Sequence, residues 1–144
     1  MACDIRIAAQ SAFVSTGYLN VALSGDYGIA WLLTRLVGTS RARELMFTSD
    51  KVDARRAETI GLVNRVVPDE KLQAEAFALA KSMAEGPTIA LRYMKDNLDE
   101  ALQFDFATAR DHEAMRLVRL TATADHKEAV QAFIDKRKPV FKGN

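Results

Sequence analysis

Apolar residues recur along this chain with two different periods, and the helical period dominates. Short apolar runs at residues 5–9 and 12–14 predict two buried strands, and residues 62–67, which end at Pro68, predict a third. Elsewhere apolar residues recur every three or four positions. This second pattern predicts helices over 28–37, 42–47, 54–60, 104–120 and 124–136, with two more on either side of Gly86-Pro87.

The predicted strands at the start raise a question of pairing. Buried strands need partners in a sheet, and two short strands make at best a marginal one. No residues precede Met1 in this sequence to supply further strands. We therefore expect the chain to correspond to the later half of something larger.

Composition and charge limit the possible functions. With 144 residues, 49% of them hydrophobic and 27% charged, the chain is long enough for one domain with a core and has an ordinary globular composition. Its net charge of +1 argues against a nucleic-acid binder, which normally presents a basic face. No run approaches the roughly 20 apolar residues that a membrane span needs.

The few cysteine and histidine side chains argue against a disulfide-bonded protein and against a metal-binding one. A single cysteine, Cys3, cannot form an internal disulfide, which suits a reducing compartment. Cys3, His112 and His126 are too dispersed to predict a metal site. The first four residues lack the basic and apolar regions of a signal peptide, so we expect a cytoplasmic protein.

The most informative segment is Ala22–Gly28, where Asp26 lies between two glycines and between two apolar stretches. Gly25 and Gly28 allow a sharp turn and a close approach to a ligand. An aspartate among apolar neighbours would have a raised pKa and suit acid–base catalysis. Alternatively, Asp26 caps the helix that starts near Tyr27, because a carboxylate there accepts bonds from free backbone N–H groups. The spacing alone leaves both interpretations open.

Several segments occur in an order that resembles the crotonase (enoyl-CoA hydratase/isomerase) superfamily over essentially the whole chain. They are Ala2-Cys3-Asp4-Ile5-Arg6-Ile7-Ala8, Ser24–Gly28, Arg35–Gly38, Ala42–Leu45, Gly61–Pro68, Asp125–Phe133 and Lys136–Pro139. The resemblance implies an α/β fold of the crotonase type. Residues 1–68 would form the end of its spiral core, and residues 69–144 its mainly α-helical oligomerisation region.

The resemblance also implies a chemistry. Crotonases act on acyl-CoA thioesters and stabilise an enolate in an oxyanion hole of two backbone N–H groups. Both donors, and one of the two glutamates typical of hydratases, belong to family segments that precede the part matched here. A polypeptide of these 144 residues is therefore expected to be inactive alone. Coenzyme A enters as part of the substrate, no separate cofactor is expected, and family members assemble as trimers or hexamers.

Carried over position by position, the resemblance names candidate site residues. Tyr18 falls where hydratases place their other glutamate, and tyrosine is a poor base at neutral pH. Asp26 falls where dienoyl-CoA isomerases and some acyl-CoA dehalogenases carry a catalytic aspartate. Two further candidates follow from their position beside Asp26 and not from the resemblance. Gly25 lets the backbone approach the substrate closely, and Trp31, one helical turn beyond the loop, would line an acyl pocket, although tryptophan in such a run is often core. Two residues of the last helix, Phe133 and Lys136, would contact the nucleotide of CoA; the alternative is a core phenylalanine and a solvated basic tail.

Two classes of function therefore stay open. The first is an acyl-CoA-processing enzyme of the hydratase/isomerase type whose N-terminal half lies outside this chain, with proton transfer by Asp26. The second is a non-catalytic, truncated crotonase that acts as a helical assembly module for itself or for a crotonase partner.

Overall fold

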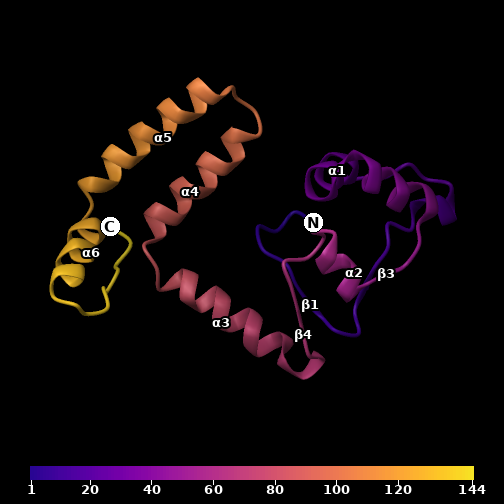
Figure 1. The fold of residues 1–144 in the computed structure, drawn as a ribbon, viewed down its shortest axis with the longest axis horizontal. Coiled ribbons are helices and arrows are strands. Elements are labelled where there is room, and N and C mark those ends of the chain that lie inside the picture. The colour runs from indigo at the N-terminus through magenta and orange to yellow at the C-terminus, as the bar shows by residue number, and fades with distance from the viewer. The chain divides into compact units, whose positions relative to one another are not determined.

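A computed structural model describes residues 1–144 and divides them into two compact units, residues 1–77 and residues 78–144. We call them unit 1 and unit 2 and describe each by itself (Figure 1). Most of the chain is helical, and its strands are few and short. None of its helices combines the length and the apolar character needed to cross a membrane.

Unit 1 contains all four strands, in two pairs. Strand β1 (Ile7–Ala9) is parallel to β4 (Arg65–Val67), with Ile7 opposite Arg65. Strand β2 (Phe13–Val14) is antiparallel to β3 (Val52–Asp53). Figure 1 shows β1 and β4 side by side.

Three expectations about the strands need correction. The strand expected over 5–9 covers only three residues and is half-buried, and the strand expected over 62–67 begins at Arg65. Strand β3 was not expected. Strand β1 pairs with a strand 58 residues further along the chain. Each sheet nevertheless has only two strands, as expected for the later half of a larger fold.

Helix α1 (Ile29–Thr48) covers two of the predicted helices and is interrupted where the sequence predicted a stop. Gly38 has φ 78° and ψ 165°, which is far from helical geometry. A positive φ costs a glycine little free energy, so one helical segment ends at Gly38 and the next begins after it. The predicted end of the first helix at Gly38 is confirmed.

Helix α2 (Ala54–Thr59) follows β3, and its ends are also those that the sequence predicts. The Asp53 carboxylate accepts a hydrogen bond from the Arg56 backbone N–H at 2.8 Å, which caps the helix. Gly61, with φ 85°, turns the chain away after its end. The core of unit 1 forms between α1, α2 and the strands from Leu33, Val37, Ala42, Val52, Ala57, Ile60, Leu62 and Val63.

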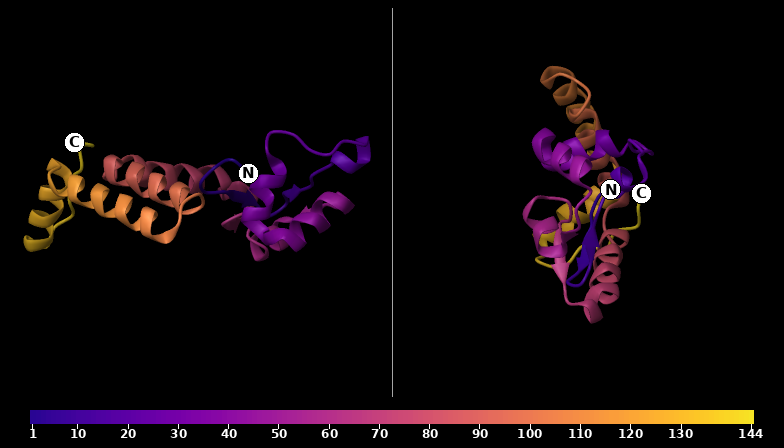
Figure 2. Two further views of the ribbon diagram at one scale, coloured as in Figure 1. Left: turned by 90° about the horizontal axis from the view of Figure 1, so that it is seen from above. Right: turned by 90° about the vertical axis from the view of Figure 1, so that its right-hand side faces the viewer.

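Two helical segments connect the last strand to the remaining helices. The short 3-10 turn η2 (Asp69–Lys71) leads directly into α3 (Leu72–Ala84). In unit 2, α4 (Thr88–Ala101) and α5 (Phe106–Thr121) run side by side as a hairpin (Figure 2), and α6 (Ala124–Ile134) follows. Side-chain caps from Asp105 and Thr123 begin α5 and α6.

The last ten residues, 135–144, fold back along α6, and we call them the C-terminal strap (Figure 1). The buried carboxylate of Asp125 accepts hydrogen bonds from the backbone N–H groups of Lys142, at 2.7 Å, and Gly143, at 2.9 Å. Glu128 holds the start of the strap through Arg137 at 2.6 Å. One carboxylate near the beginning of α6 thus fastens the end of the chain.

Candidate functional site

The segment between β2 and α1 forms a loop in which left-handed backbone conformations are frequent. It contains the 3-10 turn η1 (Tyr18–Val21), and we call residues 17–28 the site loop. Its left-handed residues are Gly17, Ala22, Gly25, Tyr27 and Gly28. In a residue other than glycine this conformation costs of order 1–3 kcal/mol, so Ala22 and Tyr27 are held there by the surrounding loop. Strain of this kind often marks a functional segment.

The loop turns back on itself and brings Tyr18 against Asp26. The Tyr18 hydroxyl donates a short hydrogen bond to Asp26 Oδ1. The N-cap of α1 is Gly28, and no side chain caps this helix. At the N-terminal end of α1, Asp26 takes part through its backbone carbonyl, which accepts a hydrogen bond from the Ile29 N–H at 2.9 Å. The interpretation of the Asp26 side chain as a helix cap is therefore wrong.

The hydrogen bond fixes which partner keeps the proton. The bond to the Asp26 carboxylate raises the pKa of the Tyr18 hydroxyl above its ordinary value of about 10. Tyr18 is therefore a donor at neutral pH and cannot serve as a base. Asp26 is exposed rather than surrounded by apolar side chains, which corrects the burial expected for it. Its second oxygen, Oδ2, accepts no hydrogen bond from the chain and is open to a ligand or water.

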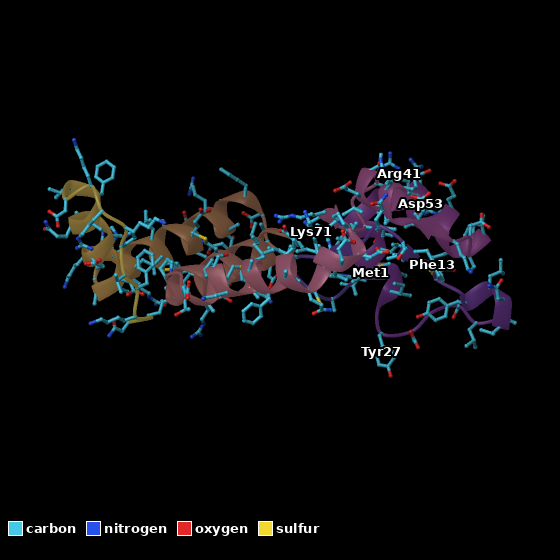
Figure 3. All side chains as sticks on the ribbon, turned by 90° about the horizontal axis from the view of Figure 1, so that it is seen from below. Met1, Phe13, Tyr27, Arg41, Asp53 and Lys71 are labelled. Carbon is cyan, nitrogen blue, oxygen red and sulfur yellow. The ribbon has the colours of Figure 1, made fainter.

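Gly25 is required where it stands. Its φ of 122° suits glycine alone, and a Cβ at this position would lie 2.7 Å from Ile29 Cγ2. Because Gly25 has no side chain, the loop can lie against the first turn of α1 at the residue just before Asp26. Tyr27, on the other side of Asp26, is 96% exposed and points away from unit 1 at the tip of the loop (Figure 3).

Trp31 lies on the first turns of α1 and is 49% exposed, so it is not a core residue. The guanidinium of Arg35, one turn later, stacks over its ring at 3.6 Å from the centroid. This cation–π contact holds the indole against its own helix. A flat, half-exposed aromatic surface of this kind suits contact with a ligand.

The two predicted residues of the last helix lie in unit 2. Phe133 is 86% exposed, so it is not a core residue. Lys136 follows the end of α6 in a left-handed conformation, is exposed, and has no ion-pair partner in the chain. The neighbouring Arg137, in contrast, is occupied by Glu128 and Asp135. An aromatic ring and an unpaired ammonium therefore stand free at the C-terminal end of α6.

Sequence reasoning missed a group of hydroxyls beneath the site loop. Ser15 and Thr16 precede η1, and both bond to the end of α1 at Ser49. No periodicity or motif marks these residues, because the contact joins positions more than thirty residues apart. No group of three or more His, Cys, Asp and Glu side chains is placed to hold a metal ion.

The whole chain, residues 1–144, matches the family model of enoyl-CoA hydratase/isomerase. A short-chain-enoyl-CoA hydratase of Clostridioides difficile is 40% identical over 133 residues, which cover 92% of this chain and 86% of that relative. A crotonyl-CoA hydratase of Syntrophomonas wolfei is 36% identical over 141 residues, which cover 98% of this chain and 54% of that relative.

The fold is similar to solved structures of the same kind. The crystal structure of an enoyl-CoA hydratase from Bacillus anthracis superposes with a TM-score of 0.94 at 36% identity. The superposition covers 99% of this chain and 55% of that one. Apart from the C. difficile relative, the chain thus spans about half the length of the proteins named here.

Proposed function

Since this chain belongs to the enoyl-CoA hydratase/isomerase family, we propose that it supplies the acid–base group of an acyl-CoA-processing enzyme of the hydratase/isomerase type. Asp26 is the catalytic residue, and it moves a proton on the acyl chain while the thioester enolate is stabilised elsewhere. The observation that carries this proposal is the hydrogen bond from Tyr18 to Asp26, which leaves one carboxylate oxygen open.

In this proposal the two residues have different roles. Asp26 removes a proton from the α or γ carbon of the acyl group with Oδ2, and the electron pair passes into the enolate. Returning the proton to another carbon moves the double bond, so one carboxylate suffices for isomerisation. Tyr18 keeps its own proton and orients the carboxylate. Hydration by the same aspartate would need a second acid–base group from outside residues 1–144.

The remaining candidates suit an acyl-CoA substrate. Gly25 keeps the loop close to α1, and Trp31 offers an apolar surface one helical turn beyond the loop. Phe133 supplies an aromatic face for the adenine, and Lys136 a point charge for a phosphate. Coenzyme A is then part of the substrate. The cytoplasmic location expected from the sequence stays a prediction.

A second candidate function, a non-catalytic helical assembly module, is favoured by one observation in unit 2. Large apolar side chains of α4 and α5 are exposed, among them Leu98, Phe106 and Val118. Such a surface marks an interface. We assign residues 69–144 to threefold self-assembly, which serves the enzyme and the assembly module equally, so assembly alone does not decide between them.

Substitution of Asp26 tests the proposed catalytic role. In a polypeptide that joins this chain to the family's N-terminal half, Asp26→Asn keeps the acceptor for Tyr18 but removes the titrating proton. Turnover of an enoyl-CoA is expected to fall by about 10²–10⁴-fold, with the melting temperature unchanged. Asp50→Asn, at an exposed aspartate of the same unit, is the matched control. Unchanged turnover in Asp26→Asn would remove Asp26 from the catalytic residues and overturn the proposal.

A further inference from the structure

Ser49, the residue after α1, is unusual among the polar residues of unit 1. It is only 6% exposed, and it has a left-handed φ of 53° although it is not glycine. The backbone accounts for part of this, because the Ser49 N–H bonds to the Leu45 carbonyl at 3.1 Å and ends the helix. Its hydroxyl takes no part in that helix end and points instead to the site loop.

The hydroxyl of Ser49 meets the turn that carries Tyr18. Ser49 Oγ accepts a hydrogen bond from the backbone N–H of Leu19 at 3.3 Å and lies 3.1 Å from Thr16 Oγ1. Thr16 Oγ1 also donates to the Leu45 carbonyl at 2.9 Å. The hydroxyls of Thr16 and Ser49 thus fasten the loop to the end of α1 on both sides of Gly17.

The hydrogen bond from Ser49 supplies η1 with a cap that the turn itself lacks. The first N–H groups of a helical turn have no partner within it, and Gly17, the N-cap of η1, provides no side-chain bond. Ser49 replaces that cap from 30 residues away in the chain. Because Tyr18 is the first residue of η1, the position of the turn decides whether its hydroxyl reaches Asp26.

We propose that Ser49 is a positioning residue, whose hydroxyl holds η1 so that Tyr18 donates to Asp26. This inference rests on the proposed function, in which Asp26 acts and Tyr18 orients it. Displacement of a catalytic group by about 1 Å already lowers rates strongly, so a support of this kind determines activity without touching the substrate.

The variant that separates the two roles of Ser49 is Ser49→Gly. Glycine adopts the left-handed conformation without strain and keeps the backbone end of α1, but it removes the hydroxyl. Relief of strain opposes the loss of the hydrogen bond, so the melting temperature is expected to stay close to that of the unchanged chain. Ser15→Ala is the matched control, because Ser15 donates to the Ser49 carbonyl at 2.8 Å and not to η1.

The test is an NMR titration of the tyrosine rings in the 144-residue chain. The chain has three tyrosines, and Tyr18→Phe assigns the signal of Tyr18. In the unchanged chain and in Ser15→Ala, Tyr18 is expected to titrate above the ordinary value of about 10, because the Asp26 carboxylate holds its proton. In Ser49→Gly its midpoint is expected to fall to that ordinary value.

Asp26→Asn separates failure of this inference from failure of the proposed function. If Asp26→Asn lowers the midpoint and Ser49→Gly does not, the pair exists and Ser49 does not position it. If neither variant changes the midpoint, the pair itself does not form, and the basis of the proposed function is lost as well. A lowered midpoint in both variants, with Ser15→Ala unchanged, supports the inference.

Discussion

The two units are stabilised in different ways. Unit 1 buries a continuous apolar cluster around Leu33, in which α1, α2 and the strands meet. Unit 2 buries only Ala132 and Asp125, and its helices are joined by charged hydrogen bonds while many large apolar side chains stay exposed. The difference indicates that unit 1 can hold a site in place by its own packing, whereas unit 2 leaves most of its large apolar side chains on the surface.

Two groups of charged bonds connect segments of unit 2. In the α4–α5 hairpin, Glu100 bonds to Arg116 and, at 2.8 Å, to His112. Arg116 also donates to Asn97 at 2.7 Å. At the other end of the unit, Glu128 accepts from Arg137 and from the Val140 backbone N–H. The first group joins α4 to α5, and the second holds the strap against α6.

The largest effect on stability is expected from Leu33→Ala in unit 1. Leu33 is fully buried, so its truncation leaves a cavity and lowers the free energy of unfolding by about 2–5 kcal/mol. Trp31, the single tryptophan, reports on unit 1 alone in urea unfolding followed by fluorescence. Leu23→Ala, at an exposed leucine of the same unit, is the control. Equal losses in the two variants would mean that the cluster does not stabilise unit 1.

The next largest effect concerns assembly through unit 2. Met94, Leu98 and Leu102 are spaced four residues apart and exposed, so they form one apolar stripe along α4. We expect a trimer at micromolar concentration in light scattering. Leu98→Ala should weaken it about 10- to 100-fold, because burial of a leucine contributes about 1.5–3 kcal/mol. A stable monomer of the unchanged chain would contradict the assignment of this stripe to an interface.

A smaller effect is expected from Asp125→Ala. Loss of the carboxylate leaves the N–H groups of Lys142 and Gly143 without their acceptor, which costs about 1–3 kcal/mol where they stay buried. The strap should then detach, and Phe141 should leave the cavity of about 190 Å³ that it lines with residues of α4, α5 and α6. Faster hydrogen exchange at residues 142 and 143 would report this. Asp99→Ala, at an exposed aspartate, should leave both amides protected.

Acid should weaken unit 2 gradually. Hydrogen bonds from Arg116 and His112 lower the pKa of Glu100 to about 2, and those from Arg137 and Val140 lower that of Glu128 to about 2. Because these carboxyl pKa values are lower in the folded chain than the glutamate value of about 4.5 in the unfolded chain, ionised Glu100 and Glu128 stabilise the fold above pH 4.5. This contribution disappears as the pH falls toward 2. Helical circular dichroism should decline over this range, less steeply in Glu100→Gln than in the exposed control Glu113→Gln. Identical profiles in the two variants would exclude Glu100 as a cause.

Sequence patterns predicted the features that short segments determine. The end of the first helix before Gly38 and the start of α2 at Ala54 depend on residues within one helical turn, and both were confirmed. The pairing of β1 with β4 depends on contacts 58 residues apart, and no local pattern records it. The same reason explains why Ser49 was missed, because its role follows from a bond to Leu19 across 30 residues.

For the candidate site, the sequence suggested candidate residues but not their arrangement. Gly25 and Gly28 predict a turn, and the structure adds left-handed conformations at Ala22 and Tyr27 that the sequence does not indicate. Without that information, Asp26 looked equally suited to cap α1. The structure brings Tyr18 and Asp26 together in unit 1, while Phe133 and Lys136 stand free in unit 2.

Proton exchange with solvent tests most directly the claim that Asp26 carries the substrate proton. The measurement follows deuterium uptake from D₂O into the α and γ positions of an enoyl-CoA, in the polypeptide that joins this chain to the family's N-terminal half. We predict rapid uptake with Asp26 present, and a loss of about 10²-fold or more in Asp26→Asn at unchanged melting temperature. Undiminished uptake in Asp26→Asn would contradict the account.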